Sequence, residues 1–273
     1  MNLSISNIAW LPKDRNKIYR FLSKEKIEGI EIAPKLLLHD IENIFKLNKK
    51  ETIKHLKELK KHNLKIVSMQ SLFFDAKDCY LFQSTKQRSN FVNHLTQIIR
   101  LAKKLGIKNL VFGSPKNRII PSDMKYIEAE KIAIKVFKKI GKIAKLNNIY
   151  LSIEPNPKEY GTNFLNTIHQ TYDFVKKVKS KNIKIILDVG SILMNLENKE
   201  IDRIIKKCIN LINHVHISEP YLKLIQNKNF IKKVTSSLKK YNYQKWISIE
   251  MRAHKSNNYI NVVKAIKLVK NYI

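Results

Sequence analysis

The chain has 273 residues, 44% of them hydrophobic, and its 53 basic and 22 acidic side chains give a formal charge of +31. This length and apolar content suit one large globular domain and exclude a disordered chain, and no apolar run approaches the roughly 20 residues of a membrane span. The N-terminus lacks the pattern of a secretory signal, and two cysteines, Cys79 and Cys208, are typical of a reducing compartment. We therefore expect a cytoplasmic protein with no membrane contact.

The positive charge is spread along the whole chain. Of the 53 basic residues, 46 are Lys and 7 are Arg, and with the abundant Ile and Asn this is the residue usage of an AT-rich genome. Proteins that read nucleic acid favour Arg for its bidentate fork and gather the charge on one face. Scattered Lys indicates solvated helix faces, so we do not expect a nucleic-acid partner. Attraction to nucleic acid, to an acidic membrane or to phosphorylated substrates is the alternative role of this charge.

Short apolar segments alternate along the chain with longer, Lys-rich amphipathic segments. Most of the short segments are continuous apolar runs, as expected for parallel strands that are covered on both faces. The predicted strands span residues 3–8, 28–32, 64–69, 107–112, 149–154, 183–188, 212–218 and 245–250. The predicted helices span about 14–24, 50–62, 85–105, 125–147, 165–179, 198–208, 228–241 and 258–272.

Eight strand–helix units of this length predict a (β/α)₈ TIM barrel, an α/β fold in which the first strand pairs with the eighth. No Gly/Ser-rich linker divides the chain, so we expect a single domain over residues 1–273. The competing architecture, a doubly wound sheet, usually has fewer strands.

The glycines are few and their places are informative. Of six glycines in the chain, five flank predicted strands. Gly29 and Gly106 come just before strands, where the chain leaves a helix and must turn. The other three follow strand ends, where a barrel places its active-site loops: Gly113, Gly161 and Gly190. Glycine there indicates tight backbone geometry around a site.

Polar residues occupy the C-terminal ends of the predicted strands, where a TIM barrel carries its functional groups. The candidate site residues at these ends are Glu31, Gln70, Glu154, Asn156, Asp188, His214, His216, Glu250 and Arg252. The fifth to eighth strands thus bring a Glu, an Asp, a His and a second Glu to one rim. Three carboxylates repel one another without a cation, and with an imidazole they suit Mn²⁺, Mg²⁺, Co²⁺ or Zn²⁺. Strand spacing allows either His214 or His216 as the ligand; the other would support it or pack inside the barrel.

Four segments at the ends of these strands carry a family resemblance. The segments IEPNP, LDVGS, HVHISEP and SIEM, at their spacing in this chain, resemble those of the xylose isomerase-like TIM barrels. The opening SNIAW and IEIAP and the closing SIEMR are similar to the sugar phosphate isomerase/epimerase group of bacterial polysaccharide and nucleotide-sugar gene clusters. The resemblance spans about residues 3–252.

The resemblance implies a specific metal centre. In the related ketose 3-epimerases, Glu, Asp, His and Glu from these four strands hold one divalent metal ion, usually Mn²⁺. Matched motif to motif, the ligands here are Glu154, Asp188, His216 and Glu250, since the family uses the second His of its His-x-His strand. The family has a further His three residues after the Asp and an Arg a few residues after the ligand His. Here Ser191 takes the first place, and the segment HISEPYLK offers Glu219 and Lys223 but no Arg.

Proton transfer next to a carbonyl is the chemistry that fits these residues. Glu154 and Glu250 would flank the substrate, one removing a proton and the other returning it through an enediolate, which gives a sugar or sugar phosphate isomerase or epimerase. The other candidate residues, including Arg118 in the loop after the fourth strand, are expected to bind the substrate, and Arg118 and Arg252 suit a phosphate or carboxylate.

Three other functions fit the same barrel. A sugar or cyclitol dehydratase would use the same metal and then expel a β-hydroxyl group, and the sequence does not separate it from an isomerase. An endonuclease IV-like apurinic endonuclease would need additional His and Asp ligands. The ends of the third and fourth strands should supply His but read SMQS and VFGS. Ser191 stands where a further His is needed, and His214 stands where an Asp is needed. A barrel that only binds a partner in a sugar pathway is the third, and the intact ligand set argues against it.

Overall fold

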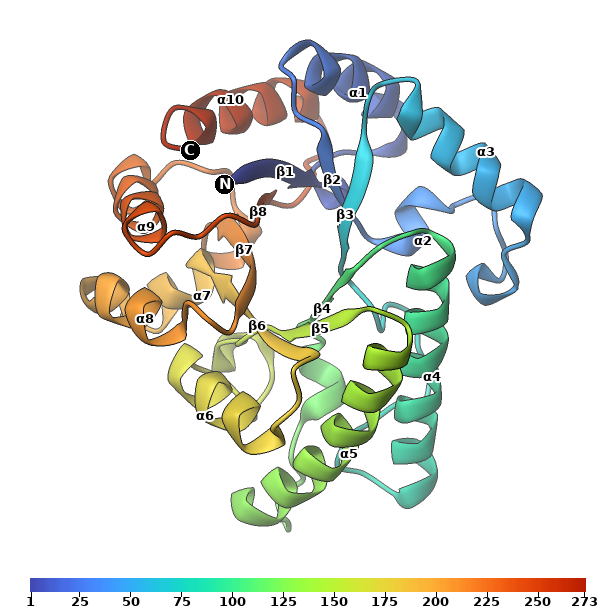
Figure 1. Cartoon of the computed structure of the whole chain (residues 1–273), viewed down its shortest axis with the longest axis vertical. Coiled ribbons are helices and arrows are strands. Elements are labelled where there is room, and N and C mark those ends of the chain that lie inside the picture. The colour runs from blue at the N-terminus through green and yellow to red at the C-terminus, as the bar shows by residue number, and fades with distance from the viewer.

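The computed structural model describes residues 1–273 and forms a closed barrel of eight parallel strands in chain order. Figure 1 shows the strands at the centre of the molecule and the helices around them. The strands are β1 (Asn2–Ser6), β2 (Gly29–Ile32), β3 (Lys65–Met69), β4 (Asn109–Phe112), β5 (Tyr150–Ile153), β6 (Ile183–Asp188), β7 (Ile212–Ser218) and β8 (Trp246–Glu250). β1 pairs with β8 from Asn2 opposite Trp246 to Ile5 opposite Ile249, which closes the barrel and confirms the predicted fold.

Eight helices match the predicted helical segments to within a few residues. They are α1 (Arg15–Lys24), α3 (Lys49–Lys60), α4 (Thr85–Lys104), α5 (Tyr126–Leu146), α6 (Ile168–Val178), α8 (Ile201–Cys208), α9 (Lys228–Lys240) and α10 (Asn258–Lys270). α6 begins three residues later than predicted because the side chain of Thr167 accepts a hydrogen bond from the backbone N–H of Gln170 and caps the helix. None of the helices has the length and apolar character to cross a membrane.

Two short helices were not predicted from the sequence. α2 (Pro34–Leu37) begins with a proline, which suits the first turn of a helix. α7 (Val189–Met194) begins where the side chain of Asp188 accepts a hydrogen bond from the backbone N–H of Ser191 at 2.6 Å. Both follow strands directly and are too short to show helical periodicity, so the sequence pattern could not separate them from loops.

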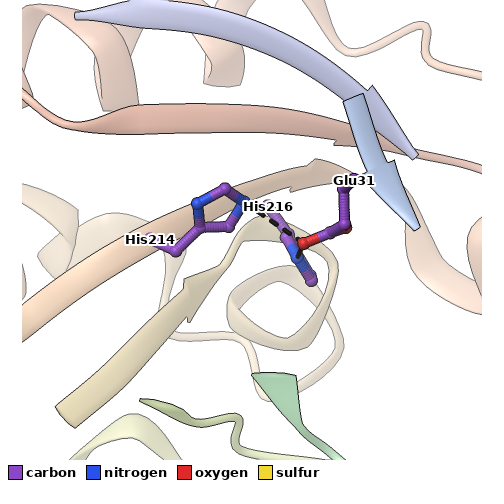
Figure 2. Close-up of side chains that lie close together, drawn as sticks. All are labelled: Glu31, His214 and His216. Carbon is purple, nitrogen blue, oxygen red and sulfur yellow. Dashed lines mark hydrogen bonds and ion pairs between the residues drawn. The ribbon is translucent and has the colours of Figure 1, made fainter. Parts of the chain in front are cut away.

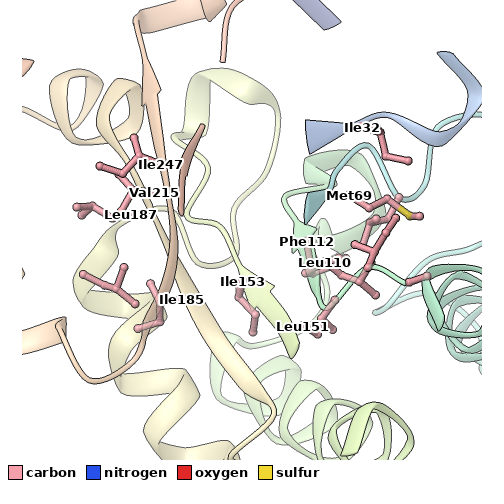
Figure 3. Packing of buried hydrophobic residues seen from close by; sticks show 14 of the residues in the cluster. Ile32, Met69, Leu110, Phe112, Leu151, Ile153, Ile185, Leu187, Val215 and Ile247 are labelled. Atoms are coloured by element: carbon pink, nitrogen blue, oxygen red, sulfur yellow. The ribbon is translucent and has the colours of Figure 1, made fainter. Parts of the chain in front are cut away.

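The hydrophobic core lies between the barrel wall and the helices. One cluster contains 75 buried residues, and Figure 3 shows part of it, including Leu110, Leu187 and Ile247 on three of the strands. Successive residues of a strand point to opposite faces. Where one side chain packs against a helix, the residues before and after it in the strand point into the barrel.

The interior of the barrel is largely polar, although the strands read as apolar runs. Ser4, Ser152 and Ser248 are fully buried there. Asn213 on β7 donates a hydrogen bond across the barrel to Asn109 Oδ1 on β4 at 2.7 Å. These polar groups satisfy one another, which is the condition for burying them without a large cost.

Gly29 has a different role from the predicted one. It is the first residue of β2, and a Cβ atom there would lie 2.5 Å from the ring of Trp246 and 2.7 Å from Cβ of Ser4. The prediction of a turn at Gly29 is therefore wrong, and close packing inside the barrel requires the glycine. Gly106, with φ of +72°, does lie in a turn before β4.

Candidate metal centre

Four predicted ligands converge at the C-terminal ends of neighbouring strands. Glu154, Asp188, His216 and Glu250 each offer one ligand atom, and these atoms all lie within 4.8 Å of one another. His216 Nδ1 is 2.8 Å from Glu154 Oε1 and 3.2 Å from Glu250 Oε2. The sequence predicted this set of four residues, and the structure brings them together.

Neighbouring backbone and side-chain groups hold the carboxylates in place. Asp188 Oδ1 accepts from the backbone N–H of Ser191 at 2.6 Å, and Asp188 Oδ2 accepts from Ser218 Oγ at 2.5 Å. A Cβ atom at Gly113 would lie 2.5 Å from Glu154 Oε2. The expected tight backbone geometry around the site is therefore present at Gly113, where only glycine leaves room for the carboxylate.

Asp188, His216 and Glu250 are buried, and the Glu154 side chain is 13% exposed. Burial raises the pKa of Glu154, Asp188 and Glu250 above that of an ordinary carboxyl group. Burial also lowers the pKa of His216, but the negative charges of Glu31 and Glu250 outweigh this effect and raise it well above the usual value. The cluster therefore demands positive charge at its centre.

Two atoms of the cluster lack the hydrogen-bond partners that buried polar groups usually have. His216 Nδ1 and Glu154 Oε1 are buried without a hydrogen-bond partner, although they are only 2.8 Å apart. The contact does not have the geometry of a hydrogen bond, so both atoms are available to a cation. Three carboxylates and one imidazole also form a donor set that divalent cations prefer. The residues thus fit one divalent ion.

A cavity of about 370 Å³ opens onto this cluster. Glu154, Asp188 and Glu250 line it, as do two predicted substrate-binding residues, Asn156 and Arg252. Glu154 and Asn156, two residues apart after β5, therefore share the cavity wall, and so do Glu250 and Arg252 at the end of β8. A larger cavity of about 470 Å³ lies beside the loops after β2 and β3 and contains none of the four ligands.

Three residues of the cavity wall are not predicted from the sequence. Ser114, Tyr160 and Tyr221 line the cavity, and the backbone N–H of Tyr221 donates to the hydroxyl oxygen of Tyr160 at 3.0 Å. The tyrosines lie in the loops after β5 and β7, and sequence periodicity does not show how such loops fold. A positive φ of 60° at Tyr221 is a conformation that its sequence gives no reason to expect.

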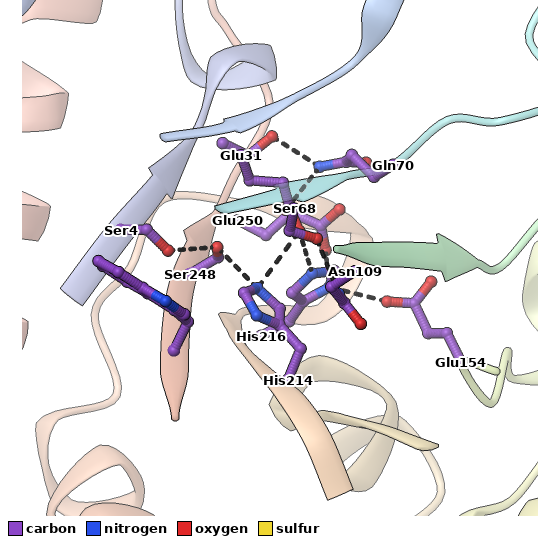
Figure 4. A network of polar contacts seen from close by, with 12 residues as sticks. Ser4, Glu31, Ser68, Gln70, Asn109, Glu154, His214, His216, Ser248 and Glu250 are labelled. Atoms are coloured by element: carbon purple, nitrogen blue, oxygen red, sulfur yellow. Dashed lines mark hydrogen bonds and ion pairs between the residues drawn. The ribbon is translucent and has the colours of Figure 1, made fainter. Parts of the chain in front are cut away.

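Three other predicted substrate-binding residues, Glu31, Gln70 and His214, lie outside the cavity wall. Glu31 and His214 are almost completely buried beneath the ligands, and Figure 2 shows both side chains beside His216. Gln70 Nε2 donates to Glu31 Oε1 at 3.2 Å. In Figure 4 these residues form one polar network inside the barrel.

Arg118 is also placed away from the cavity wall. Its side chain is fully buried, and Nη2 donates to the backbone carbonyl oxygen of Glu154 at 2.8 Å. Burial lowers the pKa of Arg118 to about 10, against the attraction of Glu154, which raises it. Arg118 thus supports the strand end that carries Glu154 and does not face the cavity.

Several solved structures share this fold at low sequence identity. 3-Keto-D-glucoside 4-epimerase (YcjR) from E. coli has a TM-score of 0.76 and 17% identity, and the match covers 99% of each chain. L-Ribulose 3-epimerase has a TM-score of 0.76 and 17% identity over 100% of this chain and 93% of that chain. The IOLI protein with a bound zinc atom has a TM-score of 0.71 and 16% identity over 100% of this chain and 99% of that chain.

The solved structures show the fold alone, and the family is identified by sequence comparison. No curated protein sequence matches the chain. The sequence profile of the xylose isomerase-like TIM barrel family matches residues 20–272, which is most of the chain. The chain therefore belongs to the xylose isomerase-like TIM barrel family.

Proposed function

We propose that the protein is a divalent-metal-dependent isomerase or epimerase of a small sugar or sugar phosphate. The observation that carries this proposal is the convergence of Glu154, Asp188, His216 and Glu250, with two buried ligand atoms left unpartnered, at the floor of a cavity. The similar structures named as epimerases support it, and so does the one named with bound zinc.

The four residues of the cluster would hold a single ion. Mn²⁺ is the favoured metal, and Mg²⁺, Co²⁺ and Zn²⁺ also suit the donor set. When bound, the ion would act as a Lewis acid that stabilises the negative charge arising on the substrate oxygens in the enediolate. Glu154, Asp188 and Glu250 supply the negative charge that retains it.

Proton transfer is assigned to two of the ligands. Glu154 follows β5 and Glu250 ends β8, and both line the cavity, so they approach a bound sugar from different sides. One carboxylate would take the proton from the carbon next to the carbonyl, and the other would return it on the opposite face. Burial raises the pKa of both groups in the metal-free protein, and the bound ion would keep both carboxylates ionised at neutral pH.

The cavity suits a substrate of monosaccharide size. Its volume of about 370 Å³ lies in the range of small-molecule sites, and Ser114, Asn156 and Tyr160 offer hydrogen-bonding groups to sugar hydroxyls. Arg252 lines the cavity with an exposed side chain and would hold a phosphate or carboxylate. We place the reaction in the cytoplasm, from the cysteine usage, and in polysaccharide or nucleotide-sugar metabolism, from the opening and closing segments of the chain.

The test is exchange of substrate hydrogen with solvent. The Mn²⁺-loaded protein is incubated in D₂O with a panel of sugars and sugar phosphates, and the same protein with EDTA is the control. We expect deuterium at one carbon next to a carbonyl, only with metal. Loss of water from a substrate would favour the dehydratase instead, and cleavage of abasic DNA would favour the endonuclease.

A further inference from the structure

Glu31 is a carboxylate buried in the barrel directly behind the metal ligands. It is fully buried and does not line the cavity. One of its oxygens, Oε2, is 3.2 Å from His216 Nε2 and 3.3 Å from His214 Nε2. Figure 2 shows the two imidazoles directed at this oxygen. A carboxylate in that position needs a function other than contact with the substrate.

Its second oxygen is occupied as well. Gln70 Nε2 donates both to Glu31 Oε1, at 3.2 Å, and to Ser6 Oγ, at 2.6 Å. The two hydrogens of the amide are thus both used, which fixes the orientation of the Gln70 side chain. Glu31 therefore receives N–H groups on both oxygens and is held from two sides.

The hydrogen bonds around His214 show that its Nε2 atom carries a proton. Ser4 Oγ donates to the backbone carbonyl oxygen of Ile247, and it lies 2.6 Å from Ser248 Oγ. Ser248 must then donate to Ser4, so the 2.8 Å contact between Ser248 Oγ and His214 Nε2 requires a proton on the imidazole nitrogen. His214 presents an N–H to Glu31 and Ser248 and needs no metal to satisfy it (Figure 4).

His216 links Glu31 to the metal centre. The Nδ1 atom of His216 faces Glu154 and Glu250, so metal binding needs its lone pair and puts the ring proton on Nε2. That N–H requires an acceptor, and Glu31 Oε2 is within hydrogen-bond distance. We infer that Glu31 is a positioning residue that holds the proton of His216 on Nε2 and directs Nδ1 at the metal centre, in a carboxylate–histidine–metal arrangement.

This inference rests on the metal centre of the proposed function and adds a residue to it. Glu31, His214 and His216 also offer ligand atoms within 4.8 Å of one another, so a second ion among them is the competing interpretation. The two interpretations differ in the number of ions bound by each chain and in whether His214 Nε2 carries a proton.

Calorimetric titration of the metal-free protein with Mn²⁺ separates these possibilities. We expect one ion per chain in the wild type and a 10- to 100-fold weaker affinity in Glu31→Gln, the range for removal of such a partner. The matched control is Ser152→Ala, which removes a buried hydrogen bond to Asn109 in the same barrel interior, and it should bind Mn²⁺ as the wild type does. Any of three results would overturn the inference. Glu31→Gln could bind Mn²⁺ within about twofold of the wild-type affinity, the control could lose as much affinity as Glu31→Gln, or the wild type could bind two ions per chain.

A second measurement needs no Glu31 variant to fold. Nitrogen-15 NMR of the Zn²⁺-loaded wild type, with the His216 signals assigned by their loss in His216→Asn, should show a protonated Nε2 and a metal-bound Nδ1. Protonated Nδ1 or a metal-bound Nε2 would overturn the inference and leave the proposed function standing. A wild type that binds neither ion would remove the proposed function and the inference with it.

Discussion

At the scale of single residues, Asp188 has two roles, and replacing it with alanine removes both. It is a predicted ligand, and it also caps α7 through the N–H of Ser191. We expect Asp188→Ala to abolish Mn²⁺ binding in calorimetry while the barrel stays folded, because a lost cap costs only about 0.5–2 kcal/mol. Asp202→Ala, which removes an exposed ion pair with Lys240 on the outer helices, is the control and should bind Mn²⁺ normally. Unchanged Mn²⁺ affinity in Asp188→Ala would refute the assignment.

Glu154 and Glu250 are the residues on which the proton transfer depends. Replacing either with Gln keeps its size and one ligating oxygen but removes the basic site. Each variant should fold, retain some metal, and lose hydrogen exchange at the substrate carbon by about 10²-fold or more, the usual effect of removing a general base. The losses should differ between the two substrate epimers because the carboxylates act on opposite faces. Wild-type exchange rates in both variants would rule out the two-carboxylate scheme.

The residues of the metal centre were largely predictable, but their supporting contacts were not. Strand parity and the position of each acid at a strand end are local properties, so Glu154, Asp188 and Glu250 could be found from the sequence. The pairing of Glu31 with His216 joins residues 185 positions apart, across the barrel from β2 to β7. Nothing in the sequence shows that contact, and Glu31 was therefore assigned to the substrate.

At the scale of elements, the end of β4 limits the position of a ligand on β5. A Cβ atom at Gly113 would come within 2.5 Å of Glu154 Oε2. We expect Gly113→Ala to fold, because the end of a Glu side chain can move, but to bind Mn²⁺ at least about tenfold more weakly, as expected when a ligand is misplaced. Calorimetry measures the affinity and thermal unfolding measures the fold.

Gly161→Ala provides the contrast for this test. Gly161 has φ of +80° and no atom within 4 Å of a built Cβ, so alanine there strains the backbone without touching Glu154. It should lose about 1 kcal/mol of stability and keep its Mn²⁺ affinity. Equal Mn²⁺ affinities in the two variants would show that the close approach at Gly113 does not control the ligand.

The elements differ in how far the sequence determines them. Long helices such as α4 have a clear period and a capping residue, Ser84, whose side chain accepts from the N–H of Gln87, and they were predicted closely. The loops that contain Tyr160 and Tyr221 take their shape from contacts with each other and with the barrel mouth. Their contribution to the cavity follows from tertiary structure, which no local pattern encodes.

At the scale of the whole molecule, the buried centre should make stability depend on pH. In the metal-free protein, burial raises the pKa of Glu154, Asp188 and Glu250, so their ionisation destabilises the fold as pH rises. The pKa of His216 is raised in spite of burial because of Glu31 and Glu250, so its contribution is complete below about pH 6.5 and is lost as pH rises through the folded-state pKa. Both effects have the same sign.

We therefore expect the Tm of the EDTA-treated protein to fall as the pH rises through the range above about 6.5. Mn²⁺ should raise the Tm most at the upper end, where it no longer competes with the proton on His216. Thermal unfolding with and without Mn²⁺ across this range checks the prediction. A metal-free protein that becomes more stable over the same range would contradict it.

We expect Glu154, Asp188, His216 and Glu250, which lie at strand ends, to hold one metal ion at the floor of the cavity. Anomalous X-ray diffraction from crystals of the Mn²⁺-loaded protein tests it most directly. We predict a single strong peak, with one ligand atom each from Glu154, Asp188, His216 and Glu250 at about 2.0–2.4 Å. A peak among Glu31, His214 and His216, or no peak at the cavity floor, would contradict the account.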